Sequence, residues 1–246
     1  MATLYAGTSG FAYPAWKPAF YPAKLPSKLF LKHYSERLNC VEVNYTFRRL
    51  PAAATLESWV SQTAAGFVFA VKANQRITHI LRLKNAEQAT TVFLNAIDPL
   101  RTARRLGPIL FQLPPQLKCD VALLRDYLAL LPRGEALSPR YAFEFRHESW
   151  LADPVYTELE SHNVSLCVAE SERLEVPEVI TADFVYYRLR KPDYTEADID
   201  AFAARARELL ATGRDLYLFF KHEETPEGAL NAEMLLQRTG ATEAAQ

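Results

Sequence analysis

The sequence predicts an α/β protein of one domain, a (β/α)8 TIM barrel over residues 1–240 with a short polar tail at 241–246. Eight short apolar segments alternate with helical segments, a pattern typical of a parallel sheet. The length of 246 residues is close to the roughly 250 residues usual for one such barrel. Six of the apolar segments end in polar side chains, which is where a barrel places its functional site. An open doubly wound sheet is the alternative.

The expected strands are bounded by turn residues and by the ends of apolar runs. They cover residues 4–9, 41–47, 67–72, 109–113, 141–146, 165–169, 184–189 and 215–221. The fourth strand is expected to stop at Pro114-Pro115, because proline cannot donate to a sheet. The link between the sixth and seventh strands has no clear helical period and is barely long enough for a crossover, so that unit is expected to be degenerate.

The expected helices follow from periodicity and from signals at their ends. They cover residues 27–38, 52–64, 85–105, 120–131, 153–162, 195–211 and 228–238. Ser27 is placed as an N-cap, and Pro154 suits the first turn of its helix. The pair Asp98-Pro99 is expected to interrupt or kink the helix that opens at Asn85.

Composition limits the classes of function. The net charge of −1 and pI near 6.5 argue against a protein coated in positive charge for wrapping duplex nucleic acid, although a local basic cleft is allowed. No apolar run approaches the roughly 18 residues of a membrane span, and the N-terminus does not resemble a signal peptide. Three widely spaced cysteines indicate reduced thiols, so we expect a cytoplasmic protein.

Carboxylates at the ends of two predicted strands are the candidate catalytic groups. Side chains two apart on a strand share a face, so Glu42 lies with Asn44 and Glu144 with Arg146. A carboxyl partly shielded in a barrel mouth can have a raised pKa that suits proton transfer, so we interpret Glu42 and Glu144 as catalytic. The alternative is that each is paired with Lys72 or Arg146 and has only a structural role.

The cations predicted near these carboxylates outnumber them, which favours an anionic ligand. Two neutral amides could orient such a ligand or satisfy backbone groups instead. The substrate-binding candidates at strand ends are Asn44, Lys72, Gln112, Arg146, Arg188 and Lys221.

Three loop aromatics, Tyr13, Trp16 and Trp150, complete the set of substrate-binding candidates. Flat side chains at the mouth suit stacking on a nucleobase or a sugar, although packing in the core is an alternative for each of them.

No cofactor or metal is predicted. The segment Gly7-Thr-Ser-Gly10 precedes a proline-rich loop and not a helix, so it forms neither a P-loop nor a dinucleotide fingerprint. Glu42, Glu144 and His222 could in principle bind a metal, but the nearby cations oppose such a site.

Motifs along nearly the whole chain resemble those of the YecE-like family, the domain of unknown function number 72. The matching segments include Gly7-Thr-Ser-Gly-Phe11, Val41-Glu-Val-Asn44, Phe67-Val-Phe-Ala-Val-Lys72, Leu106-Gly-Pro-Ile-Leu-Phe-Gln-Leu-Pro-Pro115, Glu144-Phe-Arg-His-Glu-Ser-Trp150 and Tyr186-Tyr-Arg-Leu189. The resemblance implies a (β/α)8 barrel and no particular reaction. This chain departs from the family pattern by carrying Arg48, Arg190 and Lys221, which make the mouth more basic.

The functional hypothesis is a cytoplasmic hydrolase or lyase acting on a small anionic substrate, phosphorylated or nucleotide-like, without a cofactor. The alternative is a non-catalytic module that binds nucleic acid or a protein partner through the same basic, aromatic-lined cleft. Nucleic acid is the less favoured partner, no membrane partner is expected, and the sequence does not specify the oligomeric state.

Overall fold

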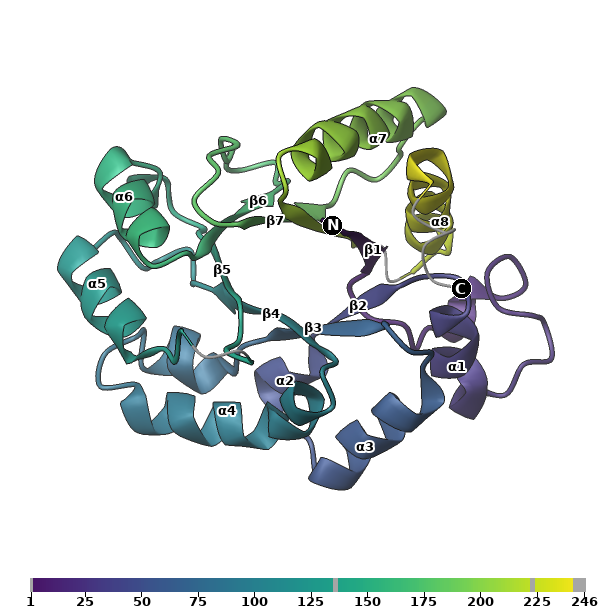
Figure 1. Ribbon diagram of the computed structural model, residues 1–246, viewed down its shortest axis with the longest axis horizontal. Helices are drawn as coiled ribbons and strands as arrows, with labels where there is room; N and C mark the ends of the chain where they lie inside the picture. The colour runs from purple at the N-terminus through teal and green to yellow at the C-terminus, as the bar shows by residue number, and fades with distance from the viewer. Residues whose placement is uncertain (1, 135–136, 222–223, 241–246) are drawn as a thin grey trace.

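Eight parallel strands form one barrel in the computed structural model, which describes residues 2–134, 137–221 and 224–240 (Figure 1). The strands are β1 (Leu4–Thr8), β2 (Cys40–Val43), β3 (Val68–Lys72), β4 (Leu106–Gln112), β5 (Tyr141–Glu144), β6 (Ser165–Ala169), β7 (Phe184–Leu189) and β8 (Asp215–Phe220). From β2 to β8, strands adjacent in the chain are adjacent in the sheet, and β1 pairs with β8. The predicted TIM barrel in a single domain is confirmed, and the open sheet is excluded.

The longer helices surround the ring of strands in Figure 1. The helices are α1 (Phe30–Ser35), α2 (Tyr45–Arg48), α3 (Ala53–Gln62), α4 (Glu87–Thr102), α5 (Val121–Leu130), α6 (Asp153–Ser161), α7 (Glu196–Ala211) and α8 (Glu227–Thr239). Short 3₁₀ turns occur at Pro14–Trp16, Ser27–Leu29 and Glu148–Trp150, and a π-helical turn at Arg76–Ile80. Residues 170–183 contain no helix, as expected for the degenerate unit. None of the described helices is both long and apolar enough to cross a bilayer.

The core has two layers because side chains alternate along each strand. One set of strand residues packs against the helices. The other set fills the barrel interior and comprises Cys40, Val68, Ala70, Leu110, Ala142, Cys167, Ala169, Phe184, Tyr186, Tyr217 and Phe219. This interior face continues into the polar residues at the carboxyl ends of the strands.

Side chains close the barrel between β1 and β2. The Tyr34 hydroxyl accepts a hydrogen bond from the backbone N–H of Thr8 at 2.8 Å and lies 3.0 Å from the Cys40 carbonyl, to which it can donate. The Asn39 side chain also bonds to the backbone of β1. A Cβ on Gly7 would lie 2.1 Å from the Cys40 oxygen, so this approach requires glycine.

Two strands end two or more residues earlier than predicted. The second ends at Val43 and the fifth at Glu144. After Asn44, which has right-handed helical angles, the chain forms α2. The Thr46 hydroxyl anchors this helix by donating to the carbonyl of Lys72 at 2.6 Å. The chain therefore forms α2 where the sequence predicted the end of the second strand. The contact with β3 places this helix over the carboxyl end of β3.

One prediction about a helix end was wrong, and the interruption expected as one possibility at Pro99 does not occur. Ser27 begins a 3₁₀ turn and does not cap α1, whose N-cap is Leu29. Pro99 lies inside α4, which continues to Thr102. Its position near the last turn limits the loss of backbone hydrogen bonds, and the buried neighbours Ile97 and Leu100 hold this end of the helix in the core.

Candidate functional site

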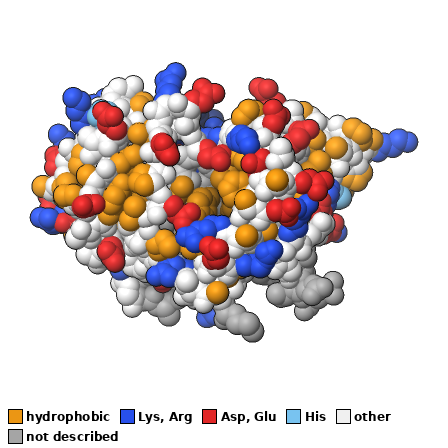
Figure 2. All heavy atoms as spheres, turned by 90° about the horizontal axis from the view of Figure 1, so that it is seen from above, with side chains coloured by type: hydrophobic (Ala, Val, Ile, Leu, Met, Phe, Trp, Pro, Cys, Tyr) orange, Lys and Arg blue, Asp and Glu red, His pale blue; other side chains and the backbone are white. Residues whose placement is uncertain are grey.

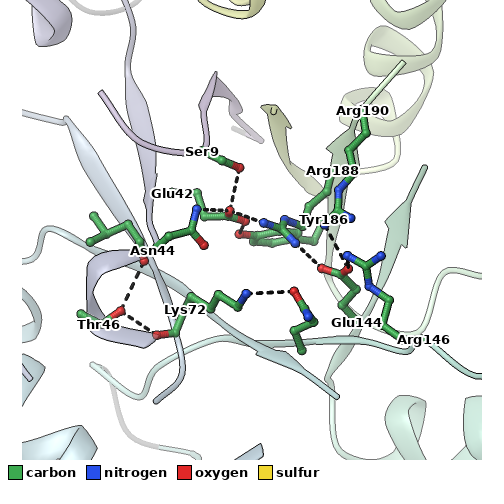
Figure 3. A network of polar contacts seen from close by, with 12 residues as sticks. Ser9, Glu42, Asn44, Thr46, Lys72, Glu144, Arg146, Tyr186, Arg188 and Arg190 are labelled. Carbon is green, nitrogen blue, oxygen red and sulfur yellow. Dashed lines mark hydrogen bonds and ion pairs between the residues drawn. The ribbon is translucent and has the colours of Figure 1, made fainter. Parts of the chain in front are cut away.

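Inward-facing side chains at the carboxyl ends of seven strands converge on one polar cluster, most of which is shown in Figure 3. The strand ends and the residues just after them supply Ser9, Glu42, Lys72, Gln112, Glu144, Arg188 and Lys221. Each of these residues lies two or four positions along the chain from a strand residue that faces the barrel interior. Because side chains alternate along a strand, all of them lie on the inner face. The structure therefore brings together the strand-end candidates that the sequence predicted.

Arg188 lies at the centre of the cluster and is 1% exposed. Its Nη2 lies 2.8 Å from Oε1 of Glu42, and its Nη1 lies 2.5 Å from Oε2 of Glu144. Both carboxylates are fully buried. Burying these charges is costly unless they are paired and hydrogen-bonded, so each of the three groups depends on the others.

Glu42 also receives two hydroxyl donors. Ser9 Oγ and the Tyr186 hydroxyl each donate to it at 2.7 Å. Burial alone would raise the pKa of this carboxyl, but the Arg188 guanidinium and the two hydroxyls outweigh burial and lower the pKa below its ordinary value. Glu42 is therefore ionised at neutral pH.

Glu144 is surrounded by three arginines. In addition to Arg188, Arg146 pairs with its Oε1, and Arg190 Nη2 lies 3.2 Å from the same oxygen (Figure 3). Burial again opposes ionisation, but the arginines lower the pKa of Glu144 to about 2. The expectation that the carboxyls at this mouth have raised pKa values was wrong, because the sequence does not reveal how many donors surround each carboxylate.

Lys72 has a different environment from the arginines. Its Nζ donates to Gln112 Oε1 at 2.9 Å and lies 4.2 Å from the ring centroid of Phe47, so neither partner carries a charge. Burial, followed by repulsion from Arg188 and Lys221, lowers the pKa of Lys72 to about 8, although the two buried glutamates oppose the shift. This amine can therefore change its protonation state near neutral pH.

A pocket of about 530 Å³ opens beside Lys72. Its lining residues come from the ends of three strands and from α2 with the residues that flank it: Asn44, Tyr45, Phe47, Arg48, Arg49, Lys72, Arg188 and Lys221. Five of these described side chains are cationic and none is acidic. The Tyr45 side chain is 48% exposed and presents an aromatic surface at the rim.

The two predicted tryptophans do not line this pocket. Trp16 and Trp150 are fully buried and pack among other core aromatics, so the prediction that they stack on a ligand was wrong. Tyr13 is half-buried and donates its hydroxyl hydrogen to the backbone carbonyl of Ser9 at 3.0 Å. The aromatic residues of the pocket are Tyr45 and Phe47.

Several residues of the cluster were not predicted as site residues: Ser9, Phe47, Arg49, Tyr186 and Arg190. Tyr186 and Arg190 could have been predicted, because each lies two residues from Arg188 and alternation along the strand places all three on the same face. Phe47 and Arg49 depend on α2, which no sequence signal indicated.

No group of three potential metal ligands occurs within residues 2–134, 137–221 and 224–240. His222, the third member of the metal site weighed above, lies outside the described residues, and so does the predicted tail at 241–246.

Comparison with known proteins gives consistent results over the full chain. UPF0759 protein YunF of Bacillus subtilis (strain 168) is 24% identical over 275 residues, covering 95% of this chain and 94% of YunF. UPF0759 protein YecE of Escherichia coli (strain K12) is 30% identical over 150 residues, covering 61% of this chain and 50% of YecE.

Solved structures of two related proteins have the same fold. A DUF72 family protein from Thermotoga maritima superposes with a TM-score of 0.83 at 26% identity, covering 96% of this chain and 98% of that one. A DUF72 family protein from Enterococcus faecalis gives 0.80 at 18% identity, covering 97% and 96%. The sequence model described as "Protein of unknown function DUF72" matches residues 5–246. The chain therefore belongs to the DUF72 family.

Proposed function

We propose that the protein is an enzyme that acts on a small anionic compound bound in the pocket at the carboxyl-terminal mouth of the barrel. The observation that carries this proposal is that five of the described residues lining the pocket are cationic and none is acidic. Arginine and lysine side chains bind phosphate and carboxylate groups through charge-assisted hydrogen bonds. The volume of about 530 Å³ lies within the range of small-molecule sites.

Unpaired polar atoms at the mouth support a polar ligand. Oδ1 of Asn44 and Nε of Arg146, Arg188 and Arg190 are buried without a hydrogen-bond partner in the part of the chain that the structure describes. Such atoms are uncommon in folded proteins and are usually satisfied by a ligand or by water. Asn44 and Arg188 line the pocket itself.

The proposed reaction is a hydrolysis or a lyase reaction in which Lys72, and not the two glutamates, exchanges a proton. Glu42 and Glu144 have lowered pKa values and are engaged by arginines, so we assign them to holding Arg188. Lys72 lines the pocket and has a pKa of about 8, which suits proton transfer near neutral pH. The free thiols support a reducing compartment such as the cytoplasm.

A nucleic-acid-binding module is the rival function. Figure 2 shows acidic and basic side chains interspersed on one side of the molecule, without the continuous basic stripe that nucleic-acid binding favours. Oligonucleotide binding that weakens steeply with added salt would support the rival.

Thermal unfolding with and without anions tests the proposal. A phosphorylated ligand at 100 times its Kd should stabilise the protein by about 2.7 kcal/mol, which corresponds to a rise in Tm of roughly 5 to 10 °C. The double variant Arg48→Gln, Arg49→Gln should lose most of this rise, whereas Arg207→Gln, at an exposed position of α7, should keep it. The proposal fails if no phosphorylated or carboxylated compound changes Tm, or if the double variant responds like the wild type.

A further inference from the structure

Among the residues that the structure describes, Lys72 is a half-buried amine without a carboxylate partner. It is the last residue of β3, and its Nζ contacts the neutral amide of Gln112 and the ring of Phe47. Among the described residues, the nearby carboxylates of Glu42 and Glu144 form their ion pairs with arginines. The chain therefore places a lysine in a partly buried pocket and leaves its charge without an ion-pair partner.

This environment activates an amine as a nucleophile. An ordinary lysine is almost entirely protonated at neutral pH, and only the neutral amine carries a free electron pair. Burial and the neighbouring cations Arg188 and Lys221 lower the pKa of Lys72 to about 8. Desolvation and a nearby cation are the two ways in which proteins activate lysines that form imines.

The pocket also provides for the rest of a substrate. Lys72 shares it with Arg48, Arg49 and Lys221, which can bind an anionic group, while the exposed face of Tyr45 can cover the organic part. An anionic compound held by these cations would lie beside Nζ of Lys72.

We propose that Lys72 forms an imine with the carbonyl group of an anionic aldehyde or ketone bound in this pocket. The inference rests on the proposed function and assigns a substrate class and a covalent step to the same site.

The covalent step needs no further reactant. The electron pair of the neutral Nζ forms a bond to the carbonyl carbon, and the nitrogen protons move to the carbonyl oxygen. The oxygen then leaves as water, and a C=N bond forms. Once protonated, this iminium accepts an electron pair from a bond on the adjacent carbon, which is how an amine catalyses a lyase reaction.

Reductive trapping with an anionic aldehyde tests the inference. The purified full chain is incubated with pyridoxal 5′-phosphate as the probe, the imine is reduced with sodium borohydride, and the labelled peptide is identified by mass spectrometry. At a low ratio of probe to protein, we expect one label per chain, located on Lys72. Pyridoxal, which lacks the phosphate, should label Lys72 about tenfold less, the loss expected for one charge-assisted hydrogen bond.

Two variants serve as controls. Lys72→Met should abolish the label, and Lys28→Met, which removes an exposed lysine, should leave it unchanged. The site of labelling in the wild-type chain is an independent measurement if Lys72→Met does not fold. Labels spread over exposed lysines, or equal labelling by pyridoxal, would overturn the inference.

The outcome for the imine is separable from the outcome for anion binding. If inorganic phosphate or phosphorylated compounds raise Tm but Lys72 is not labelled, the imine is refuted and the proposed anion site stands. If no anion raises Tm and Lys72 is not labelled, both proposals fail.

Discussion

Replacing Lys72 with methionine should make the protein more stable at neutral pH. The folded protein holds a positively charged amine in a partly buried site without a carboxylate partner among the described residues. Methionine keeps most of the aliphatic stem and removes the charge. The gain in stability would measure how much folding free energy the free protein gives up to keep this amine in the pocket.

The magnitude follows from the pKa of Lys72, which falls from 10.5 to about 8. Each pKa unit corresponds to about 1.4 kcal/mol, so the protonated amine destabilises the folded state by at most about 3.5 kcal/mol. The variant also leaves Gln112 without its hydrogen bond, at a cost of about 1 kcal/mol. Methionine retains a favourable contact with the Phe47 ring. The net gain of about 2 kcal/mol corresponds to a Tm rise of roughly 4 to 8 °C.

The sign of the pH dependence identifies the cause. Below pH 8, Lys72 is protonated in both states, and its destabilising effect is complete. Between pH 8 and 10.5, the folded amine loses its proton while the unfolded one keeps it, so the wild type gains stability relative to the variant. The Tm advantage of the variant should therefore be largest at pH 7, should vanish before pH 10.5 and should reverse at higher pH, where only the lost hydrogen bond to Gln112 remains.

Thermal and urea unfolding of the two proteins across this pH range provide the measurement, with Lys28→Met as the matched exposed control. A variant that melts lower than the wild type at pH 7, or a Tm difference that is independent of pH, would refute the argument. Either result would mean that the ammonium group of Lys72 is well solvated or paired in the folded protein.

Three further changes test other parts of the cluster and the barrel. Glu144→Gln should lower the free energy of unfolding by about 3–5 kcal/mol in urea titrations, because it removes one of the two carboxylates that pair with the buried Arg188 and the carboxylate that pairs with Arg146 and Arg190; in the wild type, the contribution of this carboxylate should decline as pH falls from its ordinary pKa of 4.5 towards about 2. Gln112→Glu should pair with Lys72, raise Tm at pH 7 and reduce both phosphate binding and pyridoxal phosphate labelling. Gly7→Ala should prevent normal closure of the barrel, seen as a large loss of Tm or of soluble protein, because its Cβ would lie 2.1 Å from the Cys40 oxygen.

Matched substitutions separate these effects from general damage. Glu158→Gln breaks an ion pair whose arginine is exposed, so it should change stability far less than Glu144→Gln. Gln88→Glu, at an exposed position of α4, should leave anion binding intact. A Cβ at Gly66 meets no atom within 4 Å, so Gly66→Ala should show only the strain of its positive φ. Equal effects within any of these pairs would contradict the corresponding explanation.

The sequence predicted the barrel and its inward-facing polar residues because both depend on local patterns. Alternating side chains placed Glu42, Glu144 and Arg188 on the inner face, and the parallel strands brought their carboxyl ends together. What the pattern could not supply was the number of donors around each carboxylate. The three arginines around Glu144 come from β7 and from the loops that follow β5 and β7, so its lowered pKa follows only from the assembled barrel.

The pocket itself was harder to predict because α2 depends on a tertiary contact. Val41-Glu-Val-Asn44 alternates like a strand, and nothing in the following residues signals a helix. The hydrogen bond from Thr46 to the Lys72 carbonyl exists only when β3 is adjacent, and it brings Arg48 and Tyr45 to the pocket. The two buried tryptophans, Trp16 and Trp150, were mispredicted for another reason. An aromatic residue in a loop can pack into the core or face a ligand, and its sequence pattern is the same in both cases.

The arrangement of charges divides the mouth into two parts with different roles. The buried carboxylates are engaged by arginines and cannot also neutralise Lys72, which binds a neutral amide instead. Within the part of the chain that the structure describes, the pocket therefore has cationic and no acidic lining residues in a partly buried site, where electrostatic interactions are stronger than in water. An incoming anion would relieve the repulsion among Lys72, Arg188 and Lys221 and would regain part of the stability lost in the free protein. The destabilisation of the free site and its affinity for anions thus have the same physical cause. The Lys72→Met and Gln112→Glu variants should therefore gain stability as they lose affinity for anions.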